Sequence, residues 1–410
     1  MLFCLPSFAS FRPLAALAQR LTGAGLWSLT LLASLFLASA EASAAAPNES
    51  ARVAAVIQDY LDGSSYNRSE QLRRAFHADA RLYLNGKDGA MREVGIEDYA
   101  AWFSKSPGQF NGRVGSLLNV QVDGDIASAK AEIVMSREPA RFVDLFLLRR
   151  SEGQWKIISK TATRHATPAP THGRQVLLVV SNVSKMPGTA LSSGNSFVEL
   201  VHAYAQFRAA GYGVQFISPE GGAVPLAYVD TSDAEQRSRV YDADFMWSLA
   251  HTRKPEEVKA EDYAALMYIG GSAAMFGLAD NPALRTLAAR LYEQQQAVIA
   301  AVCHGSAGLA DLMLADGSAL VSGKRVTGYP DAFENKNAPY YKSFPFSIEQ
   351  RLQERKGLFT QGPRNQSHVE VDGRLITGMS WESTRDVVAA IVRQLDAGKP
   401  ATADAGAARP

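Results

Sequence analysis

The sequence is poor in cysteine: Cys4 and Cys303 are its two cysteines among 410 residues. Cys4 lies in the N-terminal segment that is predicted below to be removed, so the mature chain keeps a single thiol and can form no internal disulfide. An unpaired thiol in an oxidising compartment is a liability unless it is buried or used. The residues around Cys303 must therefore decide between an inert buried cysteine and a reactive one.

An excess of charge of one sign is also missing. The formal net charge is +1 and no basic stripe is present, which argues against nucleic acid or an anionic surface as a partner. The sequence has no Cys-x-x-Cys pair and no histidine pair at helical spacing, so no metal is predicted. No glycine-rich phosphate loop follows a strand, and we predict no nucleotide and no other cofactor.

A long hydrophobic run is absent even near the N-terminus. Arg12 and Arg20 are the only charged side chains ahead of an uncharged, leucine-rich stretch at residues 26–40. This stretch is shorter than the roughly 18 residues that a membrane-spanning helix needs. It leads into small residues with an Ala-Ser-Ala site that ends at Ala44. We predict a signal peptide over residues 1–46, cleavage near Ala44, export to the periplasm or the exterior, and no stable membrane insertion afterwards; a retained anchor is the alternative.

The first of two predicted domains covers residues 49–163. It opens with an amphipathic helix whose apolar side chains recur at helical spacing, namely Val53, Val56, Ile57, Tyr60 and Leu61. Shorter helices are predicted at 69–76 and 96–103. Runs with strand character, separated by turn residues, follow at 120–122, 126–135, 142–149 and 155–160. Helices first and strands later predict an α+β domain in which a curved antiparallel sheet wraps its helices.

Several motifs of this domain are similar to those of a known superfamily: Phe76-His-Ala-Asp-Ala, Tyr99-Ala-Ala-Trp-Phe and Gln154-Trp-Lys-Ile-Ile-Ser-Lys. On these residues the domain resembles the nuclear transport factor 2-like superfamily, in particular its lumazine-binding or SnoaL-like branch. The resemblance implies a cone-shaped fold. Polar groups line a pocket in some enzymes of that superfamily, and His77 and Asp79 match such groups. Residues of this kind more often cap or end a helix, which is the interpretation we prefer.

The second predicted domain, residues 175–395, alternates strands with helices. Residues 176–181 form a continuous apolar run of the kind found in a parallel sheet that is covered on both faces. Further strands are predicted at 214–218, 264–270 and 297–302, with a hairpin at Asp372-Gly373. This order predicts a doubly wound, flavodoxin-like α/β fold with its site at the carboxyl ends of the strands. A Pro/Thr/Ala-rich linker is predicted at 164–174, and a disordered tail at 396–410.

Cys303 directly follows the predicted strand 297–302 and is itself followed by His304 and small residues. A sharp strand-to-helix turn with small neighbours is typical of a nucleophile elbow, which holds the reactive side chain above the sheet edge. A helix predicted from Gly305 would aim its N-terminal amides at the sulfur and lower the thiol pKa from about 8.5 to between about 3.5 and 7.5. We therefore interpret Cys303 as a nucleophile and Ser306 as a helix-capping residue.

The elbow Ala-Val-Cys-His-Gly is that of the ThiJ/PfpI superfamily, within the class I glutamine-amidotransferase-like fold, and residues 175–395 resemble this superfamily. The motifs Ser218-Pro-Glu-Gly-Gly, Val326-Thr-Gly-Tyr and Asp372-Gly-Arg-Leu-Ile-Thr-Gly resemble its chaperone and glyoxalase III-like branch most. The resemblance implies that Cys303 is the nucleophile and His304 its base or orienting group.

The remaining site residues are also carried over from the resemblance. Glu199 matches a carboxylate that opens the first helix of the domain and contacts the cysteine, where a protonated acid could shuttle protons. The acid that pairs with the histidine matches Glu334, with Asp331 as the alternative. The backbone amides of Gly271 and His304 would form the oxyanion site. Many relatives carry a histidine in this turn, whereas this chain reads Gly-Gly-Ser-Ala-Ala-Met from residue 270.

Three functions follow from these residues. The leading hypothesis is an exported, cysteine-dependent enzyme acting on a small carbonyl compound, as in the glyoxalase III-like conversion of methylglyoxal to lactate. The second is a cysteine amidase or peptidase that uses Cys303, His304 and Glu334 as a triad. The third is a non-enzymatic, redox-sensing or chaperone-like protein. Oligomers are common in both superfamilies, so we expect a homodimer.

Overall fold

The computed structural model describes residues 48–86, 89–136, 138–167 and 175–397. The predicted signal peptide lies outside these residues, as do most of the predicted linker and most of the predicted tail. Within the described ranges, no helix combines the length and the apolar character that a membrane crossing requires.

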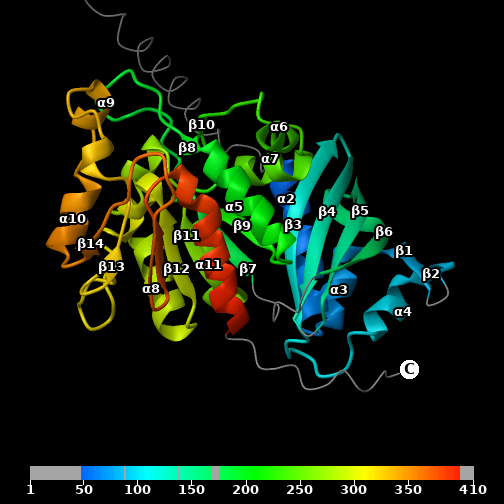
Figure 1. Ribbon diagram of the computed structural model, residues 1–410. Coiled ribbons are helices and arrows are strands. Elements are labelled where there is room, and N and C mark those ends of the chain that lie inside the picture. The colour runs from blue at the N-terminus through cyan, green and yellow to red at the C-terminus, as the bar shows by residue number, and fades with distance from the viewer. Residues whose placement is uncertain (1–47, 87–88, 137, 168–174, 398–410) are drawn as a thin grey trace, which may run out of the picture. The chain divides into compact units, whose positions relative to one another are not determined.

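The N-terminal domain consists of helices on one face of a six-stranded sheet (Figure 1). Its helices are α2 (Glu49–Ser65), α3 (Ser69–Ala75) and α4 (Ile96–Ala101). Its strands are β1 (Phe76–Asn85), β2 (Met91–Gly95), β3 (Arg113–Asp123), β4 (Ile126–Met135), β5 (Ala140–Ser151) and β6 (Gln154–Ala166). The apolar face of α2 is buried against the sheet, as its periodicity predicted, through Val53, Ile57, Tyr60 and Leu61.

The strand order β2-β1-β6-β5-β4-β3 differs from the predicted sheet in two ways. The sequence prediction missed β1 and β2, because β1 follows α3 without a turn residue and its outward positions are polar. Strand β1 also pairs with β6 in parallel, with Leu82 opposite Lys160, so the sheet is mixed rather than purely antiparallel. The α+β class of the domain is confirmed.

The C-terminal domain is built on a second six-stranded sheet, of order β15-β16-β12-β11-β7-β9. Its strands are β7 (Gln175–Val179), β9 (Val214–Ile217), β11 (Tyr263–Tyr268), β12 (Val298–Val302), β15 (Val369–Asp372) and β16 (Leu375–Gly378). Its principal helices are α5 (Phe197–Ala209), α6 (Ala234–Val240), α7 (Ala243–Ala250), α8 (Pro282–Gln294), α9 (Pro339–Lys342), α10 (Ile348–Glu354) and α11 (Thr384–Ala397).

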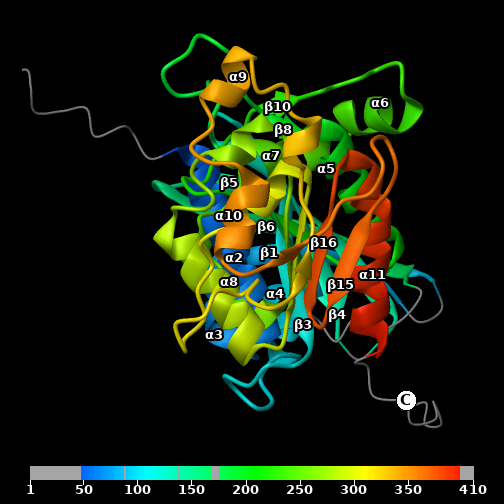
Figure 2. The same cartoon turned by 60° about the vertical axis from the view of Figure 1, so that its left-hand side comes forward.

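Helices cover both faces of this sheet, which confirms the predicted doubly wound fold. Helices α5, α7 and α11 bury their apolar side chains on one face, and α8 and α10 bury theirs on the other (Figure 1). Neighbouring strands are parallel except for the predicted β15–β16 hairpin, which runs beside α11 (Figure 2). It turns at Gly373-Arg374, one residue later than the predicted Asp372-Gly373, because Asp372 pairs with Leu375. The carboxyl ends of β11 and β12 therefore meet at one edge, where a site can form.

Two elements are longer than predicted. Strand β6 continues to Ala166, into the predicted linker, instead of ending at Lys160, because Arg164, His165 and Ala166 pair with the start of β5. Helix α11 continues to Ala397, two residues past the predicted helix end at Leu395. Composition alone predicted a linker and a tail at these residues. Strand pairing with β5 and continuation of helix α11 give the first of them regular structure instead.

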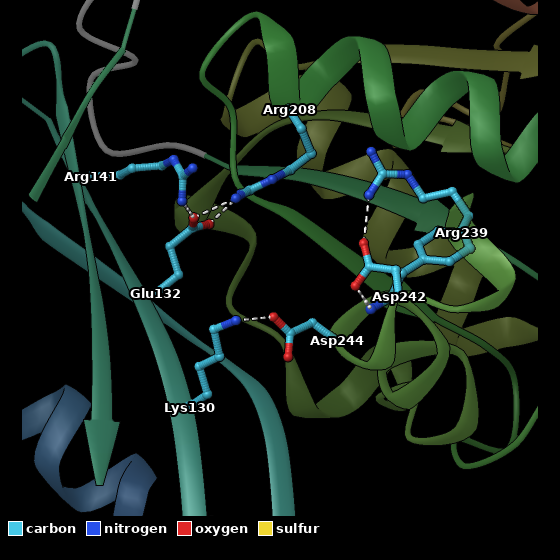
Figure 3. A network of polar contacts seen from close by, with 8 residues as sticks. Lys130, Glu132, Arg141, Arg208, Arg239, Asp242 and Asp244 are labelled. Atoms are coloured by element: carbon cyan, nitrogen blue, oxygen red, sulfur yellow. Dashed lines mark hydrogen bonds and ion pairs between the residues drawn. The ribbon is translucent and has the colours of Figure 1, made fainter. Parts of the chain in front are cut away.

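A buried carboxylate joins the two domains (Figure 3). Glu132 of β4 is 2% exposed and lies between Arg141 of β5, at 2.9 Å, and Arg208 at the end of α5. The Arg208 guanidinium donates to both carboxylate oxygens of Glu132: its Nη2 bonds Oε1 at 2.6 Å, and its Nη1 bonds Oε2. Nearby, Lys130 pairs with Asp244 of α7. Bidentate arginine–carboxylate pairs are among the strongest polar contacts in proteins.

We expect the Glu132→Gln variant to lose about 3–5 kcal/mol of unfolding free energy, since it leaves two partly buried guanidinium groups without their anion. Urea unfolding followed by fluorescence measures this loss. The matched control is Asp125→Asn, which breaks the exposed Arg149–Asp125 pair and should cost no more than about 1 kcal/mol. Equal losses in the two variants would contradict a specific role for Glu132.

Candidate active site

The turn after β12 holds Cys303 in a strained conformation. Cys303 has φ 56°, in the left-handed region that residues other than glycine rarely adopt. It opens a 3-10 helix, η4 (Cys303–Leu309), rather than a helix starting at Gly305 as predicted. A Cβ at Gly305 would lie 2.5 Å from the Tyr268 carbonyl oxygen, so this turn needs glycine. Ser306 is not a cap, because its hydroxyl donates to the carbonyl of Thr327.

The turn after β11 lies directly against the cysteine. A Cβ at Gly270 would come within 2.8 Å of the Cys303 Cβ and 2.9 Å of the Glu199 Oε2. Gly271 has φ 99°, and a Cβ there would lie 2.4 Å from the Gly194 carbonyl oxygen. Two glycines in succession thus bring backbone amides up to the sulfur without a side chain between them.

Glu199 lies in the first turn of α5 and is 1% exposed. Its Oε2 accepts a hydrogen bond of 2.7 Å from the Gly270 amide. Burial raises the pKa of Glu199 to about 7, although hydrogen bonds from Gly270, Ser196 and Cys303 act in the opposite direction. The carboxyl can therefore both hold and release a proton near neutral pH.

The thiol of Cys303 does not have the lowered pKa that the sequence predicted. Burial raises its pKa well above the usual range, and the negative charge of Glu199 raises it further. The amides of His304 and Gly271 hydrogen-bond the sulfur and lower the pKa, but by less than burial raises it. The prediction was wrong because Cys303 is only 7% exposed and because a carboxyl, not solvent, faces the sulfur.

A second polar chain leads away from the sulfur. The Cys303 Sγ lies 3.4 Å from the His304 Nδ1, and the His304 Nε2 lies 2.9 Å from the Glu334 Oε1. Of the two acids that the sequence left open, the structure therefore places Glu334 against the histidine. The carboxylate of Asp331 instead bonds Lys336, Ser347 and Tyr341, and so anchors the loop that carries Glu334.

Sequence reasoning missed the aromatic residues around His304. The Tyr340 hydroxyl donates to the Glu334 Oε2 at 2.9 Å, on the side opposite the histidine contact. The Tyr329 ring stacks on the His304 ring with centroids 4.5 Å apart, and Phe344 meets the same ring edge-on. Tyr340 carried no signal in the sequence, because it lies in the short helix α9, far from the elbow in the chain.

We expect the Tyr340→Phe variant to lower kcat/KM about tenfold, since it removes a hydrogen bond to a carboxylate that orients His304. Most of the loss should appear in kcat, because the hydroxyl positions the histidine rather than the substrate. Steady-state kinetics over a pH series measure it. The matched control is Tyr241→Phe, which changes a tyrosine that is 80% exposed and lies outside this network. A loss of the same size in that control would contradict a specific role of Tyr340.

Other polar residues singled out in the sequence stay apart from this site. His77 and Asp79 lie exposed on strand β1, where the Asp79 amide donates to the His77 Nδ1, so they do not cap a helix. The described residues contain no cluster of three or more histidine, cysteine, aspartate or glutamate side chains suited to a metal ion.

Two family models match the chain. The model described as DJ-1/PfpI family matches residues 190–394, which is half of the 410 residues. The chain belongs to the DJ-1/PfpI family. The model described as "putative lumazine-binding" matches residues 48–162. The predicted fusion of a nuclear transport factor 2-like domain to a ThiJ/PfpI-like domain is therefore confirmed.

Curated relatives and a solved structure match the DJ-1/PfpI domain. A glutathione-independent glyoxalase of Schizosaccharomyces pombe, hsp3102, is 28% identical over 54% of this chain and 98% of its own length. The glutathione-independent glyoxalase HSP31 of Saccharomyces cerevisiae is 28% identical over 55% and 98%. The crystal structure of Rapid Encystment Protein 24 kDa of Francisella tularensis superposes with a TM-score of 0.51 at 25% identity, over 54% of this chain and 99% of that one.

Proposed function

We propose that the protein is a glyoxalase III-like enzyme that converts methylglyoxal to lactate without glutathione or another cofactor. The observation that carries the proposal is the contact between a strained, buried cysteine and a buried carboxyl whose pKa is about 7. A nucleophile and a proton carrier in direct contact are what an internal rearrangement of a dicarbonyl needs. The glyoxalase names of the curated relatives support the substrate class.

In the proposed first step, the Cys303 sulfur adds to the aldehyde carbon, and the carbonyl oxygen becomes a hemithioacetal oxygen. The amides of Gly271 and His304, which hydrogen-bond the sulfur in the free enzyme, lie where they can stabilise charge on that oxygen. Glu199 takes up the thiol proton as the S–C bond forms and passes it to the hemithioacetal oxygen, so its carboxylate is free to accept a proton in the next step.

In the second step, the hydroxyl proton of the hemithioacetal moves to the neighbouring carbonyl oxygen, the hydrogen on the former aldehyde carbon leaves as a proton, and a proton is delivered to the neighbouring carbon. The result is a thioester of lactate on Cys303, with no net change in oxidation state. Glu199 is the group placed to move both protons, because its carboxyl contacts the sulfur. Water then cleaves the thioester, and lactate and the free thiol are formed.

A second candidate function is amide or peptide hydrolysis. The observation in its favour is the chain from Cys303 through His304 to Glu334, with contacts of 3.4 and 2.9 Å. This is the order of nucleophile, base and orienting acid that thioester-forming hydrolases use. The same three residues can activate water for the last step of the glyoxalase reaction, so their arrangement alone does not distinguish amide hydrolysis from the glyoxalase function.

The deciding experiment supplies methylglyoxal to the purified protein without glutathione and measures lactate enzymatically. Parallel assays offer small amides and unstructured peptides. Lactate formation that depends on both Cys303 and Glu199 supports the proposal. Amide cleavage that depends on Cys303 and His304 but not on Glu199, without lactate formation, would replace it with the hydrolase function.

We also propose that the protein is exported and forms a homodimer. Export is supported by the charge and hydropathy pattern of residues 1–46. Cell fractionation and intact mass should find a periplasmic or secreted chain that begins near residue 45, and a membrane-bound chain of full mass would favour a retained anchor. Sedimentation of the purified protein tests the dimer.

A further inference from the structure

The outer face of the N-terminal sheet carries a line of side chains that the proposed function does not use. Along β5, Phe146 and Leu148 are buried against the helices, so the alternating residues Val143, Leu145 and Leu147 point to the opposite face. Leu145 and Leu147 are 50% and 55% exposed. At the end of this line, Arg141 lies on the same outer face, two residues before Val143.

Helices of the C-terminal domain border this face and turn it into a groove. Two hollows of about 630 and 560 Å³ lie there and share Lys130, Leu145, Thr161 and Asp244 in their walls. We call them together the sheet groove. The residues of helices α5, α6 and α7, with the N-cap of α7, that line it are Tyr204, Arg208, Arg239, Asp242, Ala243 and Asp244.

One end of the sheet groove is basic. The charged side chains gathered there are four cations and three anions: Lys130, Arg141, Arg208 and Arg239, with Glu132, Asp242 and Asp244 (Figure 3). After pairing, one positive charge remains. Arg141 and Arg239 line this end with side chains that are 26% and 27% exposed, so part of each remains accessible from the groove.

The other end of the sheet groove is apolar. Its walls include Tyr83, Ala129, Leu145 and Leu147. Across both hollows, the strand from Val143 to Leu147 spans roughly 13 Å. An elongated apolar floor that leads to a single surplus positive charge is complementary to a molecule with one anionic group and a hydrocarbon tail. A neutral or cationic amphiphile would leave that charge unmatched.

We propose that the sheet groove binds an amphipathic monoanion, a carboxylate on an aliphatic chain. The carboxylate pairs with the accessible parts of the Arg141 and Arg239 guanidinium groups, which line the basic end. The chain lies along Leu145 and Leu147 towards Tyr83. This site is separate from Cys303 and holds whether or not the enzyme forms lactate.

Isothermal titration calorimetry of the full chain with dodecanoate tests the proposal, with dodecanol as the uncharged probe of equal length. Dodecanoate should bind saturably, and dodecanol at least about tenfold more weakly, since a charged hydrogen bond is lost. Arg239→Gln and Arg141→Gln should each weaken dodecanoate about ten- to a hundredfold. Leu147→Asp, at an exposed position, should weaken it at the apolar end.

The matched control is Arg149→Gln, an exposed arginine on the same strand that pairs with Asp125 and does not line the groove. It should bind dodecanoate as the parent does, and the unfolding midpoints of all variants serve as the check on folding. The proposal is overturned by absence of binding, by equal binding of dodecanol, or by a Kd that none of the groove variants changes. It is also overturned if Leu147→Asp converts a dimer to a monomer and dodecanoate does not bind, because the groove is then an interface between copies of the chain.

Discussion

The Cys303→Ser variant is expected to lose lactate formation by about 10⁴-fold or more. A serine hydroxyl is a far weaker acid than a thiol, and its smaller oxygen reaches less far from the backbone toward the bound aldehyde. The backbone conformation of the turn should stay the same, because serine can adopt the same φ of 56° and the neighbouring glycines are kept. The measurement is lactate formed from methylglyoxal by equal amounts of the two proteins.

Thermal unfolding of the same variant separates lost chemistry from lost folding. The midpoint should stay within a few degrees of the parent, since Cys303 packs as a small buried side chain and makes no covalent bond. Undiminished lactate formation would assign the reaction to another group. A protein that forms no lactate but suppresses aggregation of a client equally well with serine at this position would fit the chaperone-like hypothesis instead.

The position of the nucleophile could be predicted from the sequence because its causes are local. A buried strand that runs into Cys303, followed by small residues, leaves few conformations other than a tight turn above the sheet edge. Glu199 could be placed in the first turn of a helix for the same reason. That these two side chains meet follows from the order of the parallel strands, which the alternation of strands and helices indicates.

The electrostatics of the site could not be predicted in the same way. The sequence favoured a lowered thiol pKa, but the pKa depends on how completely other parts of the chain exclude water from the sulfur. Which acid pairs with His304 likewise depends on long-range contacts. The Asp331 carboxylate bonds Lys336, Ser347 and Tyr341 instead, which leaves Glu334 as the partner of the histidine. The hydrogen bond from Tyr340 to Glu334 also depends on how this loop folds, so the sequence did not predict it.

The missed strands β1 and β2 have a related explanation. An edge hairpin with one solvent-facing side carries polar residues at alternate positions, and a strand preference is weak there until partners exist. Pairing of β1 with the long strand β6 supplies those partners. Local strand propensity therefore predicted strands that have a clear buried face. It failed for β1 and β2, which form strands because of their pairing in the folded sheet.

The Glu199→Gln variant is expected to lower kcat by about 10²- to 10⁴-fold, the range typical of losing a positioned proton carrier. Glutamine keeps the size of the side chain and can still accept from the Gly270 amide, so the packing of α5 is retained. It cannot exchange a proton with the hemithioacetal. The matched control is Glu382→Gln, which removes a nearby charge that has only a minor effect on the pKa of Glu199 and should retain most of the activity.

The same variant should make Cys303 more reactive toward iodoacetamide at low pH while turnover falls. The negative charge of Glu199 is the second cause of the raised Cys303 pKa, after burial. Removing it lowers that pKa, so the alkylation rate should rise at a lower pH than in the parent. Alkylation and turnover that fall together would contradict the assignment, because they would mean that Glu199 serves only to form the thiolate.

Stability against pH gives an independent measure of the same carboxyl. Burial raises the pKa of Glu199 from 4.5 to about 7, so folding favours its protonated form. That contribution is complete below pH 4.5 and is lost as the pH rises through 7, an effect of about 3 kcal/mol for a shift of this size. The unfolding free energy of Glu199→Gln relative to the parent should therefore increase by about that amount between acid and mildly alkaline pH. A constant difference across this range would mean that the carboxyl titrates normally, and Glu199 would then be unable to hold the proton that the proposed second step requires.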